Sequence, residues 1–334
     1  MSLRHDAAAV ATLQRWLEAG ASHDAEYADA LSNHLPMALC ALYRLGADAT
    51  RLQAFAETYA ERLRPAPPAQ AWPRGDAWPP RLGDAAAWPA YRELFATWLQ
   101  HEDGAAVLAA VLPRLMQGCG GAAFHGLIRT AYAVQSGLGP EVADALAYWA
   151  CRWAPHGADS GPEPANAGSE RNPAVVLRRL PVPRRPPAGR LISQRMAGVQ
   201  EQPGFAAAAA QLQVDEGTLQ TLACGAAELY AASGNFTVLH LLTGAHALRV
   251  LLPFLEEPLP AVRAYWRAFA AGWAASGARD RGAARLRTWD EIVTHATASD
   301  DEHVIKLVDS CREQERAYGG EVWRRAASRV LATG

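Results

Sequence analysis

The chain of 334 residues is almost without lysine: of its 32 basic Lys and Arg residues, only Lys306 is a lysine. It also lacks an excess of either charge, since the formal net charge is -2 and charged residues make up 20% of the composition. Proteins that bind nucleic acid or anionic membranes usually carry a strong basic field. We therefore expect no nucleic-acid partner.

Cysteine motifs and targeting segments are missing as well. The first six residues carry charge and lack the apolar stretch of a signal peptide. The least polar segment, residues 236–255, is interrupted by His240, His246 and Arg249, which predicts a buried helix and no membrane partner. The cysteines are odd in number and form no Cys-x-x-Cys pair, which favours a reducing compartment over a disulfide framework. They stand at positions 40, 119, 151, 224 and 311. We expect a cytoplasmic protein.

Alternating runs of Val, Ile, Thr and Tyr, which are typical of strands, are absent. Apolar residues recur instead at spacings of three and four, as at positions 10, 13 and 17 or 108, 111 and 115. This periodicity predicts an all-α, bundle-like fold of many helices. We expect one domain over residues 1–334, with helical halves at 1–153 and 191–334. A linker rich in Pro and Gly at 154–190 would join them and be most mobile at 155–173.

Residues 118–123 match the loose dinucleotide-binding pattern G-x-G-x-x-A. That pattern is meaningful only between a strand and a helix. Here residues 105–116 have a helical pattern, and Glu141 follows a Gly-Pro turn instead of ending a strand. We interpret the segment as a glycine-rich turn between two helices. P-loop, G-x-S-x-G and H-E-x-x-H motifs are also absent, so no flavin or dinucleotide fold is expected.

Several of the ten histidines lie in apolar segments. Any one of them is explained as a core imidazole with one hydrogen bond. A group of them is different, because burying imidazoles costs desolvation without a packing gain over leucine. Helical bundles build metal sites from inward-facing side chains, and neutral imidazole binds zinc, copper, iron and nickel. The apolar set comprises His34, His125, His240 and His246, while His295 and His303 flank an acidic turn and His5, His23, His101 and His156 are expected at the surface.

The other 31 basic residues are arginines, which leaves two interpretations of Lys306: a chance survivor on a helix surface, or a residue that does what arginine cannot. Only lysine can lose its proton on burial, form a Schiff base or be carboxylated to a metal-binding carbamate. Residues 299–302 fit the capping box S-x-x-E, which predicts a helix starting near residue 300. His303 and Lys306 would then share a face. A histidine and a lysine buried together repel each other if both are charged. A metal bound by neutral imidazole and a carbamylated lysine would remove this repulsion.

Four separated motifs resemble the questin oxidase-like family, over about residues 25–320. They are Asn33-His34-Leu35-Pro36-Met37-Ala38, Phe124-His125-Gly126-Leu127-Ile128-Arg129, Phe236-Thr237-Val238-Leu239-His240 and Asp301-Glu302-His303-Val304-Ile305-Lys306. The resemblance implies Baeyer–Villiger-type oxygen insertion that opens anthraquinone or related rings, with NADPH as electron donor and without a flavin fold. A related ring-cleaving type implies non-haem iron held by four histidines and a carboxylated lysine.

Carried over motif by motif, the resemblance implies His34, His125, His240, His303 and Lys306 as iron ligands, with His246 as a weaker sixth. Arg129 and Tyr132 would shape a buried substrate pocket. We expect an iron-dependent oxygenase that uses molecular oxygen on a small hydrophobic aromatic or quinone-like ring. Two alternatives stay open: a metal-independent helical protein that binds a small molecule, and a zinc-dependent hydrolase. The metal content of the purified protein distinguishes the three.

Overall fold

The computed structural model describes the chain except residues 1–5, 74–76, 156–167, 182–186, 283 and 333–334. Within the described residues the only sheet is an antiparallel pair, β1 (Glu26–Tyr27) and β2 (Leu31–Ser32). Everything else that is regular is helical, so the predicted all-α fold is confirmed.

The helices follow one another from α1 to α7 before the predicted linker and from α9 to α16 after it. The first group is α1 (Ala7–Gly20), α2 (Leu35–Leu45), α3 (Ala49–Ala60), α4 (Trp88–His101), α5 (Gly104–Met116), α6 (His125–Ser136) and α7 (Gly139–Cys151). The second is α9 (Ile192–Gln200), α10 (Phe205–Ala209), α11 (Thr218–Ser233), α12 (Phe236–Leu251), α13 (Pro258–Ser276), α14 (Trp289–Ala298), α15 (Glu302–Tyr318) and α16 (Val322–Ser328). Short 3-10 helices lie at η1 (Pro79–Arg81), η2 (Ala85–Ala87), η3 (Gly121–Phe124), η4 (Leu252–Phe254) and η5 (Arg329–Ala332).

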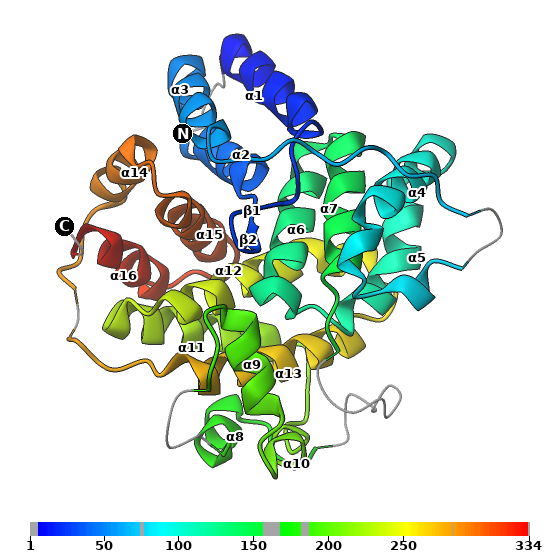
Figure 1. Ribbon diagram of the computed structural model, residues 1–334. Helices are drawn as coiled ribbons and strands as arrows, with labels where there is room; N and C mark the ends of the chain where they lie inside the picture. Colours follow the sequence, from blue (N-terminus) through cyan, green and yellow to red (C-terminus); the bar gives the residue numbers. More distant parts are fainter. Residues whose placement is uncertain (1–5, 74–76, 156–167, 182–186, 283, 333–334) are drawn as a thin grey trace.

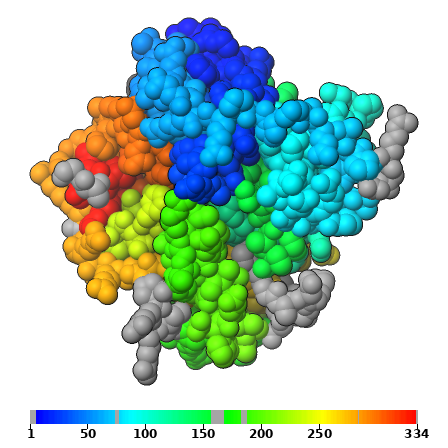
Figure 2. Space-filling model, viewed as in Figure 1, coloured from blue at the N-terminus to red at the C-terminus, as the bar shows by residue number. Residues whose placement is uncertain are grey.

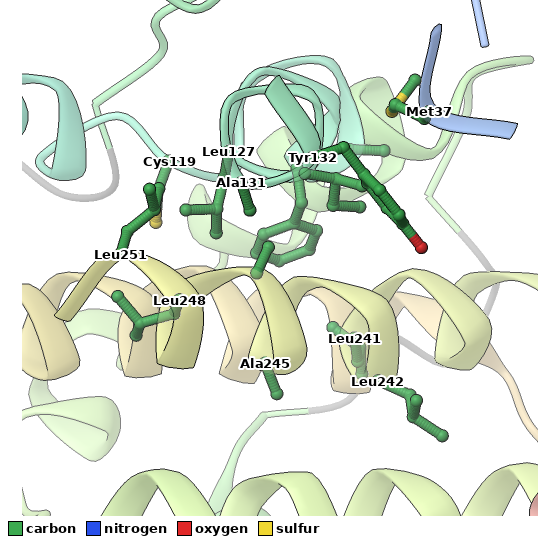
Figure 3. Close-up of a cluster of buried hydrophobic side chains, with 14 of the residues drawn as sticks. Met37, Cys119, Leu127, Ala131, Tyr132, Leu241, Leu242, Ala245, Leu248 and Leu251 are labelled. Carbon is green, nitrogen blue, oxygen red and sulfur yellow. The ribbon is translucent and has the colours of Figure 1, made fainter. Parts of the chain in front are cut away.

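Helix α12 runs through the middle of the molecule, where it packs against α6, α11, α13 and α15 (Figure 1). Figure 3 shows apolar side chains of α6 and α12 in this part of the core, among them Leu127 and Ala131 of α6 and Leu241 and Leu248 of α12. Together with η4, α12 is long and apolar enough to cross a membrane, but most of its residues are buried inside the protein. This burial identifies α12 as a core helix, which is what the interrupting residues His240, His246 and Arg249 predicted.

Helices from the two predicted halves pack on one another: α2 lies against α15, and α6 against α12. The segment predicted as a linker contains a helix of its own, α8 (Pro173–Arg179), which packs on α10 and α11. Most of the stretch 155–173, for which we predict mobility, lies outside the described residues, as do His5 and His156. The division into halves stays a prediction.

The glycine-rich segment forms a turn between α5 and α6, as predicted. Here Gly121 lies so close to the chain after α7 that a Cβ atom would come within 1.9 Å of the carbonyl oxygen of Arg152. Gly121→Ala should therefore lower the free energy of unfolding by about 1–3 kcal/mol or more, measured by urea denaturation. The control is Gly225→Ala in α11, whose Cβ would have no neighbour within 4 Å. It should be neutral or stabilising by about 0.5–1 kcal/mol, and equal effects of the two substitutions would contradict the prediction.

Candidate metal centre

Four histidines from distant parts of the sequence meet at one place in the core. His34 directly precedes α2, His125 begins α6, His240 lies in the second turn of α12, and His303 lies in the first turn of α15. The ring centroid of His34 lies 4.6 Å from that of His125 and 4.7 Å from that of His303. His240 closes the circle, at 5.0 Å from His125 and 5.6 Å from His303. Ring nitrogens of His34, His125 and His303 lie within 4.8 Å of one another, a spacing that could hold a metal ion.

Backbone carbonyls fix the orientation of two of these rings. The Nδ1 atom of His125 lies 2.5 Å from the carbonyl oxygen of Ala122, and that of His240 lies 2.8 Å from the oxygen of Phe236. A carbonyl can only accept a hydrogen bond, so in both rings Nδ1 carries the proton and Nε2 carries the lone pair. Nε2 of His125 is buried and has no hydrogen-bond partner among the described residues. Metal-binding histidines are held in this way, with one nitrogen tied to the protein and the other facing the ion.

The turn before His125 has an unusual backbone. Ala122, Ala123 and Phe124 have φ angles of 46°, 55° and 69°, in the left-handed region that non-glycine residues rarely adopt. Each such residue costs about 1–3 kcal/mol, and strain of this kind is concentrated at functional sites. Here the turn brings the carbonyl of Ala122 back onto the ring of His125, which fixes the ring.

Lys306 is buried beside the histidines, with 2% of its surface exposed, so it is not a cation on a helix surface. Its Nζ atom lies 3.1 Å from Nδ1 of His34. Burial lowers the pKa of its ammonium group to about 8, and the nearby carboxylates of Glu302 and Asp301 oppose this shift. The side chain can therefore lose its proton far more readily than an exposed lysine can.

Burial favours the neutral form of all four imidazoles. Burial lowers the pKa of His34, His125 and His240 well below the usual value, and the positive charge of Lys306 lowers it further. Burial also lowers the pKa of His303, although its hydrogen bond with Asp301 opposes the shift. Neutral imidazole is the form that binds a transition metal.

The sequence did not single out Glu302, which the structure places beside this centre. Its Oε1 atom lies 3.6 Å from Nδ1 of both His34 and His303. Its Oε2 atom lies 3.8 Å from a guanidinium nitrogen of Arg62. The signal was present in the run Asp301-Glu302-His303, where an acidic residue precedes a candidate ligand. The capping-box pattern, however, already explained the presence of Glu302 as a helix-capping residue.

Helix α15 begins at Glu302, close to the predicted start near residue 300, but the predicted capping box is wrong because Asp301 and not Ser299 is the N-cap. Ser299 is instead the C-cap of α14, and its hydroxyl accepts a hydrogen bond from the backbone N–H of Asp301. The side chain of Asp301 caps α15 by accepting the N–H of His303 at 2.8 Å. His303 and Lys306 still lie one turn apart, so the predicted shared face survives the correction.

The weaker candidates lie outside the circle of four rings. His246 contacts the hydroxyl of Ser310 through Nδ1 at 3.0 Å, and its ring faces Tyr132 at 6.3 Å between centroids. The Tyr132 hydroxyl donates to Asp309, at 2.8 Å. Arg129 forms a buried ion pair with Glu141 of α7, with distances of 2.7 and 2.9 Å. His295 is exposed on α14.

The fold and this cluster define a helical protein built around a buried centre of histidines and one lysine. The chain belongs to the questin oxidase-like family, whose model matches residues 31–311 and so includes the whole cluster. No curated protein matches the chain. Family membership places the protein among the oxidoreductases of the oxidase or oxygenase type.

Proposed function

We propose that this protein is an iron-dependent oxygenase that uses molecular oxygen to insert oxygen into, or to cleave, a hydrophobic aromatic or quinone-like ring. The observation that carries the proposal is the circle of four imidazoles, in which Nε2 of His125 is buried and has no hydrogen-bond partner among the described residues. Without an ion, so many desolvated polar rings at one point would destabilise the core. NADPH is the proposed electron donor. All five cysteines are free thiols, which supports a cytoplasmic location.

The residues present fit such an ion. His125 and His240 would bind it through Nε2, and His34 and His303 would complete the imidazole set. Lys306 would bind either directly or as a carbamate formed on Nζ. Bound iron would supply Lewis acidity and redox capacity for the activation of oxygen. The protein holds the ligands neutral, orients two of them with backbone carbonyls and keeps bulk water away from the buried rings.

The test is elemental analysis of the protein purified without added metal, combined with oxygen uptake in the presence of NADPH. Near-stoichiometric iron supports the oxygenase, whereas zinc would favour a hydrolase and an absence of metal would favour a binding protein. Helix α12 offers a matched pair of variants. His240→Asn should lose the metal, and His246→Asn, six residues further along the same helix, should keep it. Equal loss in both would overturn the proposed ligand set.

Glu302→Gln should lower metal affinity by about 10- to 100-fold, the usual effect of removing a group that orients the ligands. The carboxylate lies 3.6 Å from both His34 and His303, and the neutral amide would hold the two rings less firmly. Affinity is measured by competition with a chelator of known strength. The control is Asp300→Asn, because this neighbouring carboxylate is exposed and pairs with Arg51. A Glu302 variant with unchanged affinity would show that this carboxylate does not support the centre.

A further inference from the structure

An exposed aromatic ring lies directly on the histidine cluster. Phe236, the first residue of α12, is 52% exposed, although large apolar side chains are rarely so exposed in the part of the chain that the structure describes. Its ring centroid lies 4.8 Å from that of His240 and 4.7 Å from that of His303. Leu31, three residues before His34, is 42% exposed. Apolar surface that faces both solvent and the buried centre marks the side from which a flat apolar ring can approach.

Helix α9 lies below the hairpin of β1 and β2 (Figure 1), and in the space-filling view its green surface borders the blue N-terminal part of the chain (Figure 2). Just before the helix, Arg190 donates a hydrogen bond to the carbonyl oxygen of Asp29 in the hairpin, at 3.0 Å. On the helix, Arg195 extends toward the start of α12, where its Nη2 atom lies 3.4 Å from the hydroxyl oxygen of Thr237. Thr237 follows Phe236 and lies one turn before His240. Arg195 therefore reaches the first turn of α12, the turn that Phe236 begins.

The guanidinium of Arg195 is poorly satisfied. It has no ion pair with any carboxylate of the described chain, and its Nε atom is buried without a hydrogen-bond partner. Three other arginines share the unpartnered Nε, but each has a strong acceptor elsewhere: Arg324 pairs with Glu321, Arg263 donates to a backbone carbonyl, and so does Arg329. Among the described residues, Arg195 has only the long contact with the Thr237 hydroxyl. It also lies at the positive end of the α12 dipole, which disfavours a second positive charge and favours an anion.

We propose that Arg195 binds an anionic oxygen of the substrate, a carboxylate or an ionised phenol, while the aromatic ring that carries it packs on Phe236 and faces the histidine centre. A charge-assisted hydrogen bond to guanidinium is strong and directional, and it would satisfy the buried Nε. The ring would gain contact with an aromatic face that is otherwise in water. This inference rests on the proposed function, because it takes the histidine centre as the reacting end of the site.

The test compares a matched pair of probes, naphthalene-2-carboxylate and naphthalene-2-carboxamide, by isothermal titration calorimetry on the protein as purified. The wild type should bind the acid at least about tenfold more tightly than the amide. Arg195→Gln should remove this preference, and Arg195→Lys should keep an intermediate one. Phe236→Ala should weaken both probes alike. Arg190→Gln makes the same change of charge five residues earlier, at an arginine already paired with Asp29, and should leave the preference intact.

Three results would overturn the inference: no preference for the acid in the wild type, a preference that survives Arg195→Gln, or an equal loss in Arg190→Gln. Circular dichroism verifies the fold of each variant, and Arg195→Lys supplies the comparison if Arg195→Gln does not fold. Calorimetry measures binding of the probes independently of catalytic turnover and of the metal content of the protein. A protein that contains no iron but still prefers the acid would overturn the proposed function and leave the anion site standing. A protein that contains iron but does not prefer the acid would overturn the anion site and leave the proposed function standing.

Discussion

Replacing Lys306 by arginine is expected to abolish binding of the proposed metal and to lower the stability of the protein. The side chain is 2% exposed and its Nζ atom lies 3.1 Å from His34. Arginine keeps its proton and cannot take up carbon dioxide, so it can be neither a ligand nor a carbamate. It would also place a permanent charge and a larger side chain among the four imidazoles, and such overpacking typically costs about 1–3 kcal/mol.

The measurements are elemental analysis and urea denaturation. Lys306→Met separates the two effects, because an apolar side chain of similar length should also lose the metal but should not bury a charge. The control is Arg312→Lys on the same helix, where the guanidinium lies 6.0 Å from the ring of Trp289 and away from the centre. This variant should retain both metal and stability. If Lys306→Arg retained its metal, the lysine would not be a ligand, whereas electron density continuing beyond Nζ would demonstrate the carbamate directly.

Much of the fold was predictable because helical periodicity is a local signal. Apolar residues at spacings of three and four specify which face of each segment is buried, and that is sufficient for an all-α architecture. His34, His125, His240 and His303 could be selected for a related reason, since a polar ring in an apolar helix is conspicuous in the sequence. Their arrangement in one circle was not predictable from the pattern, because it depends on how four distant helices pack.

The features that the sequence did not reveal depend on tertiary contacts. Two capping signals lie within three residues of each other at the start of α15, and local rules do not decide between Ser299 and Asp301. The left-handed turn at residues 122–124 has no signal of its own, because alanine and phenylalanine normally avoid that conformation. Arg195 is one arginine among many, and it is distinguished by an unpartnered Nε together with the lack of a carboxylate or carbonyl acceptor among the described residues.

A second large effect is expected at Asp309, which joins the three helices that carry most of the histidine cluster. This carboxylate of α15 is 2% exposed. It accepts hydrogen bonds from Arg44 of α2, with Nε 3.0 Å from Oδ1, and from the hydroxyl of Tyr132 of α6, at 2.8 Å. Burial raises the pKa of Asp309, while Arg44 and Tyr132 oppose this shift. The same three helices begin at or next to His34, His125 and His303.

Asp309→Ala should lower the free energy of unfolding by about 3–5 kcal/mol in urea, because it leaves Arg44 and Tyr132 without their buried acceptor. Asp309→Asn keeps an acceptor and should lose only about 1–3 kcal/mol. The control is Glu313→Gln, one turn further along α15, where the carboxylate is more exposed and pairs with Arg316. This substitution should change the free energy of unfolding by less than about 0.5 kcal/mol. Equal effects of Asp309→Ala and Glu313→Gln would show that the network does not hold the helices together. Because Asp309 contacts none of the four histidines, a folded Asp309→Asn protein with weakened metal binding would demonstrate that the packing of α2, α6 and α15 sets the geometry of the centre.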